Sequence, residues 1–153
     1  MMLDLQQLEK KLQFNEFNCE TALEIGLSMI EDAKKDDLQI AIDICVNGHQ
    51  LFHFAFDGTA PNNDAWIIKK NRLTNRYSMS SFQFKFKLLS QNRTLADVGL
   101  SNSEYAAIGG AFPIIIKNVG VVGTITVSGL KDEDDHAVVV AAIEKYMKKH
   151  ALL

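Results

Sequence analysis

The chain has 153 residues, of which 47% are hydrophobic and 23% charged, so it has the length and composition of one globular domain with a sizeable core. Its net charge of −3 gives no basis for binding nucleic acid or anionic lipid. The start, MMLDLQQLEKKL, carries acids and lysines and is not a signal peptide, and no apolar run reaches the ~20 residues that span a bilayer. We therefore predict a single domain over residues 1–153 in the cytoplasm, with no membrane association.

The first two predicted elements are helices. Residues 1–12 place Leu5, Leu8 and Leu12 on one side of a short amphipathic helix. Residues 19–35 also repeat apolar side chains at helical spacing, and two lysines suit the C-terminal end of that helix.

A β-hairpin follows in the stretch LQIAIDICVNGHQLFHFAF. Asn47-Gly48 is the preferred pair for a two-residue type I′ turn, in which both positions need positive φ. Regular pairing from this turn puts Ile42 opposite His53, so that Asp43 and His53 fall on opposite faces of the hairpin. Both faces are then largely apolar, which predicts a sheet covered by helices on both sides.

A third helix is predicted in the stretch GTAPNNDAWIIKKNRLTNRY, with Asn62 or Asn63 as its cap. At 100° per residue, Lys70 shares the apolar stripe that contains Trp66. Two interpretations of Lys70 stay open: its charged end reaches solvent from the edge of the core, or it faces an anionic ligand or a buried carboxylate. A basic stripe lies beside it and consists of Lys69, Arg72 and Arg76.

The rest of the chain predicts one ambiguous element, a second hairpin and a closing helix. Residues 80–90 fit a strand and a helix equally well. Residues 111–117 and 120–128 are β-branched runs joined at Asn118, and residues 132–150 form the last helix. Asp132 is expected to cap this helix, with Asp135 three positions on, as in a capping box. Helices flanking two hairpins predict an α/β protein of the α+β type with a mainly antiparallel sheet.

Few residues in this chain are arranged for chemistry. No GxSxG, HExxH, P-loop or dinucleotide-binding glycine pattern is present, which favours a binding protein over an enzyme. His136 is the best placed histidine, because it lies on the sheet-facing stripe of the last helix, one turn from its start. It is either a metal ligand or a structural histidine. The acids at the start of this helix complement its dipole, so anion capture there is disfavoured.

Several segments together resemble a known family. They are FHFAFDGTAPNNDAWIIKKNRL, SMSSFQF, YAAIGGAFPIIIKNVGVVGTITVSGL and DHAVVVAAI, which lie between about residues 20 and 147. They are similar to an uncharacterised family in the haem-degrading-domain group, which includes GlcG-like proteins, HbpS-like proteins and the C-terminal domain of PduO-type proteins. The resemblance implies a profilin-like fold, with a five-stranded antiparallel sheet and helices on both faces, and it favours a helix over 80–90.

The resemblance also implies a site and an assembly. Members tend to form dimers or higher rings, and some distant relatives bind haem or corrinoid. The recurrent polar positions of the family map onto a set from which we predict ligand-binding residues: Thr59, Asn63, Trp66, Lys70, Ser81, Gly110, Asp135 and His136. His136 is also the predicted metal ligand. Position 69 is Lys where the family often has Arg, so a bidentate grip on a carboxylate is lost there.

Three functional hypotheses follow. The first is an oligomeric protein that binds a small anionic ligand such as haem or corrinoid, with Lys70 and Lys69 meeting its carboxylates, Trp66 as an apolar wall and His136 as axial ligand. The second is an oligomeric scaffold without chemistry, in which Lys70 pairs with a carboxylate across an interface. The third, ranked last, is acid–base catalysis by His136 and Asp135.

Overall fold

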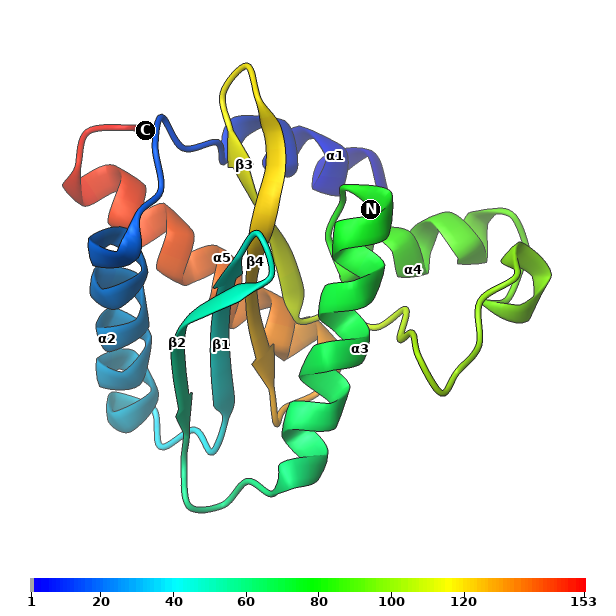
Figure 1. Ribbon diagram of the computed structural model, residues 1–153, viewed down its shortest axis with the longest axis horizontal. Coiled ribbons are helices and arrows are strands. Elements are labelled where there is room, and N and C mark those ends of the chain that lie inside the picture. The colour runs from blue at the N-terminus through cyan, green and yellow to red at the C-terminus, as the bar shows by residue number, and fades with distance from the viewer. Residues whose placement is uncertain (1) are drawn as a thin grey trace.

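The computed structural model describes residues 2–153 and contains α-helices on both sides of one antiparallel sheet (Figure 1). The helices are α1 (Met2–Lys11), α2 (Cys19–Lys35), α3 (Pro61–Tyr77), α4 (Ser81–Ser90) and α5 (Asp132–Lys149), with a short 3₁₀ helix η1 (Ala96–Val98). The strands are β1 (Ala41–Val46), β2 (His49–Ala55), β3 (Ala111–Ile116) and β4 (Gly120–Ser128), in the order β2-β1-β4-β3. Within residues 2–153, no helix is both long enough and apolar enough to cross a bilayer.

The main core lies between the sheet and the layer formed by α2 and α5. Ile42 and Ile44 of β1 pair with Val127 and Ile125 of β4, and all four are fully buried against these helices. The other face of the sheet is covered by α3, with α4 beyond it and α1 packed on α4 (Figure 1). The two hairpins with helices on both faces confirm the predicted α+β class.

The sheet has four strands, so the expectation of five strands is wrong. The segment before α2 contributes one parallel bridge at the outer edge of β3, between Phe14 and Ile116. Phe14 donates to the Ile115 carbonyl (2.7 Å) and accepts from the Lys117 amide (2.9 Å). The segment extends no further as a strand, because Asn18 already caps α2 four residues later.

A bulge in the first hairpin changes the predicted register. Val46 pairs with His49 as expected, but the register shifts between Ile44 and Cys45, and from there on Asp43 pairs with His53. The prediction that Asp43 and His53 lie on opposite faces is therefore wrong. The Nδ1 atom of His53 lies 3.8 Å from Asp43 Oδ1 and its Nε2 atom lies 3.4 Å from Asp64 Oδ1.

The sheet face under α3 is polar, contrary to the expectation of two apolar faces. The buried Asp43 accepts hydrogen bonds from Gln50 Nε2 (2.6 Å) and Asn71 Nδ2 (3.0 Å), and Asn71 also accepts from Thr126. Such groups are tolerated inside a fold because each is hydrogen-bonded to another. Specific hydrogen bonds therefore connect α3 to this face of the sheet.

The N-terminal caps of α3 and α5 differ from the predicted ones. Pro61 is the first residue of α3, and Asn63 accepts from the Ala60 amide (2.9 Å) from inside the first turn. Asp132 lies in the first turn of α5 and not at its cap, which is Lys131 without a capping side chain. Residues 81–90 form a helix, as the family resemblance favoured, because Ser80 caps them by accepting from the Gln83 amide (3.0 Å).

The buried Glu9 joins α1 to the start of α4. Its carboxylate accepts from Ser80 N (2.8 Å) and Ser80 Oγ (2.7 Å). The side-chain amide of Gln83 faces the same carboxylate. With its Nε2 atom turned toward Glu9, it donates to both carboxylate oxygens, at 2.8 and 3.0 Å. Burial raises the pKa of Glu9 from 4.5 to about 7, against the opposing effect of the Ser80 hydrogen bonds.

Glu9→Gln should change how stability depends on pH. The folded chain holds the Glu9 proton more tightly than the unfolded chain, so wild-type stability falls as the pH rises from about 4.5 to 7. The variant lacks this loss, so its unfolding free energy relative to wild type should rise by roughly 3 kcal/mol across that window. Urea unfolding at several pH values measures the difference, with Glu16→Gln at an exposed position as control. Parallel curves for wild type and Glu9→Gln would contradict the assignment.

Candidate functional site

A buried ion pair connects α3 to the start of α5. Lys70 Nζ lies 3.2 Å from Asp135 Oδ2, and the two side chains are 1% and 3% exposed. The lysine also donates to the Val127 carbonyl (3.0 Å), while Asp135 Oδ1 accepts from the Leu130 amide (2.9 Å). Lys70 therefore meets a buried carboxylate, and the interpretation in which it reaches solvent is wrong.

Burial and attraction act in opposite directions on this pair. Burial lowers the pKa of Lys70, and the charge and hydrogen bond of Asp135 oppose that effect. Burial likewise raises the pKa of Asp135, and Lys70 together with the Leu130 amide opposes it. Removing either partner would leave the other as an uncompensated buried group.

The loop at Gly109-Gly110 is shaped by the same lysine. Gly110 has φ +138°, and a Cβ atom there would lie 2.6 Å from Lys70 Nζ and 2.5 Å from the Val127 carbonyl oxygen. A side chain at this position would therefore collide with the ion pair. Ser81 holds the next residue of the loop, because its hydroxyl accepts from the Ala111 amide (3.1 Å).

Asp132 makes a second link at the start of α5. Its Oδ2 atom accepts from Lys85 Nζ of α4 (2.8 Å) and from the Gly109 amide (3.1 Å). Asp132 and Asp135 thus each receive one lysine and one backbone amide. The acidic first turn of α5 consequently binds α3, α4 and the glycine loop together, in addition to complementing the helix dipole.

His136 packs against two phenylalanine rings. Its ring centroid is 4.6 Å from that of Phe82 and 6.0 Å from that of Phe112, and the residue is 7% exposed. Its Nδ1 atom is buried and has no hydrogen-bond partner among residues 2–153. Burial lowers the pKa of His136 to about 4, with Asp132 opposing, so the ring is neutral at pH 7. Across residues 2–153, no group of three or more His, Cys, Asp or Glu side chains is placed to hold a metal ion.

An apolar hollow of about 420 Å³ lies beside this cluster, between α3, α4 and the irregular segment 91–110. We call it the α3–α4 cleft. Its apolar lining consists of Trp66, Leu88, Leu89, Leu95, Tyr105, Ala106, Ala107 and Ile108. Its polar lining consists of Lys85, Arg93 and Asn102. The volume is within the range of roughly 300–1,000 Å³ that is usual for small-molecule sites.

A smaller polar hollow of about 240 Å³ adjoins the α3–α4 cleft, because Trp66 and Ile108 line both. Asn63, Lys70 and Asp135 also line the polar hollow. In its wall, Asn63 Nδ2 donates to Ser128 Oγ (3.3 Å). The two hollows together offer an apolar compartment and a polar end.

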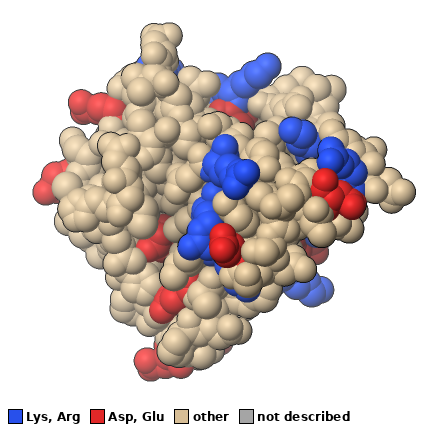
Figure 2. All heavy atoms as spheres, turned by 45° about the vertical axis from the view of Figure 1, so that its right-hand side comes forward, with Lys and Arg blue, Asp and Glu red and all other residues tan. Residues whose placement is uncertain are grey.

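Three cations of α3 lie over aromatic rings: Lys69 over Trp66, Arg72 over Tyr105 and Arg76 over Tyr77. Lys69 Nζ lies 4.7 Å from the centroid of the Trp66 ring, and Arg76 donates to the Tyr105 hydroxyl (3.0 Å). Arg72 donates to the Glu104 carbonyl (2.6 Å) and so fastens α3 to the segment 91–110. Figure 2 shows lysine and arginine side chains gathered on this face of the molecule.

The structure brings some of the predicted site residues together and separates others. Asn63, Trp66, Lys70 and Asp135 line the polar hollow. The remaining four do not line either hollow: Thr59, whose hydroxyl donates to the Phe56 carbonyl (2.7 Å), Ser81, Gly110 and His136. The predicted roles of all these residues in ligand binding stay predictions.

Of the residues that line the α3–α4 cleft, Trp66 alone was predicted from the sequence as a site residue. Lys85 belongs to the stretch whose periodicity fitted both a strand and a helix. Arg93 and Tyr105 lie in the irregular segment 91–110, where no periodicity indicates direction. The basic stripe beside Trp66 on α3 was the available signal for this face.

Comparison with known proteins places this architecture in a family. A profile of haem-degrading HbpS-like proteins matches residues 17–144. UPF0303 proteins of Streptomyces coelicolor and Edwardsiella ictaluri are 39% and 40% identical to this chain, over 94% and 91% of its length and 92% and 89% of theirs. The chain therefore belongs to the HbpS-like haem-degrading family, which confirms the resemblance found in the sequence.

Solved structures agree with this assignment. The crystal structure of Ybr137w protein aligns with a TM-score of 0.90 at 29% identity, covering 97% of this chain and 89% of that one. A double mutant of HbpS from Streptomyces reticuli aligns with a TM-score of 0.69 at 21% identity, covering 87% and 88%. At that lower identity the likeness concerns the fold alone.

Lys70→Met should destabilise the fold strongly, because it leaves the Asp135 carboxylate buried without its partner. We expect a loss of about 3–5 kcal/mol in unfolding free energy. Lys70→Met combined with Asp135→Asn should lose less than the sum of the two single changes, since the pair is then removed as a unit. Urea unfolding at pH 7 measures all three variants, and Lys69→Met, next in sequence and half-buried, should change stability by about 0.5 kcal/mol or less. Additive losses would contradict direct coupling.

His136→Phe should remove part of the acid sensitivity of the fold. Between about pH 6.5 and 4 the unfolded wild-type chain takes up a proton that the folded chain excludes, so wild-type stability falls as the pH falls. The variant should keep roughly 3 kcal/mol that the wild type loses over this range. Unfolding free energies from urea titrations at pH 4 and 7 test this, with His49→Gln at an exposed position as control. An unchanged pH dependence would show that the imidazole takes up its proton in the folded state.

Proposed function

We propose that this protein binds a small amphipathic anion in the α3–α4 cleft. One observation carries the proposal: a mainly apolar hollow has cations at its rim and the indole of Trp66 in its wall. An apolar ligand body fits the leucine and alanine lining, and its carboxylates fit Lys85 and Arg93. The polar hollow offers hydrogen-bonding groups at the adjoining end.

The family supports a tetrapyrrole carboxylate as the first ligand class to test. Its members are described as haem-degrading, and a solved structural neighbour with a TM-score of 0.68 at 11% identity is a PduOC–haem complex. The cleft lining fits the apolar faces and carboxylates of such a ligand. His136 does not line the cleft and is enclosed by Phe82 and Phe112, so its surroundings do not fit axial ligation of iron. We therefore derive no step through iron and propose no reaction.

Arg93 is a better candidate than Lys85 for the principal contact with a carboxylate of the ligand. Lys85 already pairs with Asp132 at 2.8 Å, so its charge is partly compensated. Arg93 is exposed, and its guanidinium donates to the Asp97 carbonyl (2.9 Å), which leaves other guanidinium donors for a bidentate grip. Lys69 lies over Trp66 and adds positive charge beside the same wall.

A homo-oligomeric scaffold without ligand is the second candidate function. Exposed leucines on α2 favour it, since Leu23 and Leu27 are 44% and 53% exposed on a helix otherwise packed into the core. The pairing of Lys70 with Asp135 inside one chain differs from the cross-interface pairing that this hypothesis predicted. In this function the α3–α4 cleft would have no occupant.

Tryptophan fluorescence can measure ligand binding, because Trp66 is the single tryptophan of the chain and lines the cleft. Titration with protoporphyrin IX or haem should quench its fluorescence to saturation. Arg93→Ala should weaken binding by about tenfold, through the loss of one charged hydrogen-bonding group. The two ligands should bind with similar affinity, since the proposed contacts involve carboxylates and apolar faces.

Lys117→Ala is the matched control, because Lys117 is an equally exposed cation in the turn between β3 and β4. It should leave affinity unchanged. Equal losses in Lys117→Ala and Arg93→Ala would indicate general charge attraction and contradict this site. No saturable quenching by either ligand would contradict a tetrapyrrole, and a strong preference for haem that His136→Phe abolishes would restore the role predicted for His136.

A further inference from the structure

The positive charge of the chain is concentrated in one stretch. Residues 65–96 contain seven of the 16 lysines and arginines and none of the 19 aspartates and glutamates. This stretch comprises most of α3, all of α4 and the start of the segment 91–110. Lysine and arginine side chains accordingly gather on one face of the molecule (Figure 2), although the net charge of the chain is −3. Such a face attracts acidic partners from solution.

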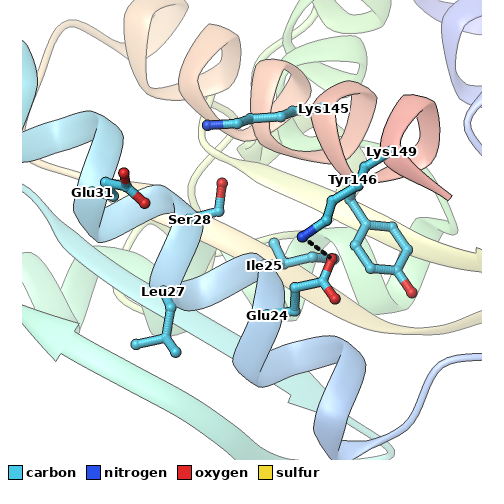
Figure 3. Close-up of a pocket in the computed structure, with 8 residues that line it drawn as sticks. All are labelled: Glu24, Ile25, Leu27, Ser28, Glu31, Lys145, Tyr146 and Lys149. Carbon is cyan, nitrogen blue, oxygen red and sulfur yellow. Dashed lines mark ion pairs between the residues drawn. The ribbon is translucent and has the colours of Figure 1, made fainter.

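Cations on the other side of the sheet are paired with carboxylates. Lys145 of α5 lies 3.0 Å from Asp32 of α2, and Lys149 lies 3.9 Å from Glu24. Figure 3 shows the second of these pairs across the hollow between the two helices. The charges of these lysines are therefore compensated within the chain.

Two arginines of the basic stripe on α3 have no such partner. Among residues 2–153, neither Arg72 nor Arg76 forms an ion pair with a carboxylate, and both are exposed. Arg72 donates to the Glu104 carbonyl (2.6 Å) and Arg76 to the Tyr105 hydroxyl (3.0 Å), and both acceptors are neutral. Both guanidiniums also lie over the Tyr105 ring, 5.9 and 5.6 Å from its centroid. These contacts hold the two side chains in place and leave their charge available to a carboxylate.

An exposed apolar side chain continues the row formed by these arginines. Ile68 lies four residues before Arg72 on α3 and is 55% exposed. Residues four apart on a helix are separated by about 6 Å, so Ile68, Arg72 and Arg76 form a row about 12 Å long. Alternate side chains of an extended chain are about 6.6 Å apart. An extended segment with one apolar and two acidic residues at alternate positions therefore matches the row.

The surroundings of this row favour a protein segment over a nucleic acid. Single-stranded nucleic acids bind through bases that stack on free aromatic faces. Here the rings of α3 have cations over them, because Lys69 lies 4.7 Å from the Trp66 centroid and Arg76 lies 5.8 Å from that of Tyr77. The exposed Ile68 suits an apolar side chain and has no counterpart in a phosphate backbone.

We propose that Ile68, Arg72 and Arg76 form a docking surface for an acidic, extended segment of another protein. Two carboxylates of that segment contact the guanidiniums, and an apolar side chain packs on Ile68. None of the three residues lines the α3–α4 cleft or the polar hollow. The surface therefore goes beyond the proposed ligand binding, and ligand titration of the cleft succeeds or fails independently of it.

Fluorescence anisotropy on the whole chain tests the proposal, with a fluorescein-labelled peptide of one leucine followed by six acidic residues as the probe. The peptide should bind saturably at low ionic strength, and added salt should weaken the binding. Arg72→Gln combined with Arg76→Gln should weaken it about tenfold. Glutamine removes the charge but keeps an N–H donor for the Glu104 carbonyl and the Tyr105 hydroxyl.

Two further variants keep the test valid if the double variant fails to fold. Ile68→Ser, at an exposed position, should weaken binding about threefold through the loss of apolar contact. Lys117→Gln removes an exposed cation in the turn between β3 and β4 and should leave the affinity unchanged.

Several outcomes overturn the proposal. One is the absence of saturable binding, and another is an equal loss of affinity in Lys117→Gln and the arginine double variant. Tighter binding of a fluorescein-labelled oligouridine than of the acidic peptide would assign the face to nucleic acid. A changed sedimentation coefficient in the folded double variant would show that the face contacts a second copy of the chain.

Discussion

The structure depends on the buried contact between Lys70 and Asp135. This ion pair joins the middle of α3 to the end of β4 and the start of α5, at sequence separations of 57 and 65 residues. A charge this deeply buried is tolerable only with a partner and further hydrogen bonds, so each group restricts where the other can lie. Gly110 is part of the same arrangement, because a side chain there would occupy the space of the lysine.

This constraint explains why the acidic start of α5 differs from an anion-binding helix terminus. Asp132 and Asp135 accept from amides of Gly109 and Leu130 and attract lysines from α4 and α3. The negative charge at this end is therefore part of the connection between elements. The α3–α4 cleft lies beside this rigid cluster, and its lining comes from α3, α4 and the irregular segment 91–110.

The residues that carry the family resemblance overlap only in part with those that line the cleft, because the segments of the resemblance supply Trp66 and residues 105–108 of its lining. Ser81 and Gly110 shape the glycine loop, and His136 packs in the interior. The contacts of these three residues are therefore made inside the protein. Lys85 and Arg93 of the cleft lie outside the segments that carry the resemblance. One frame can serve different ligands through the side chains that line its site.

The sequence by itself determined the two hairpins, most of the helices and the family, because these depend on local periodicity, turn residues and a long motif. Tertiary structure alone decided the partner of Lys70, since sequence spacing cannot tell a solvent-facing lysine from one aimed at a distant aspartate. It also decided the bulge that brings Asp43 and His53 to one face, because a one-residue shift in pairing reverses the side-chain alternation beyond it. The fifth strand is missing for a similar reason: the segment around Phe14 reaches the sheet for one bridge before α2 begins, and that distance is fixed only when both elements are packed.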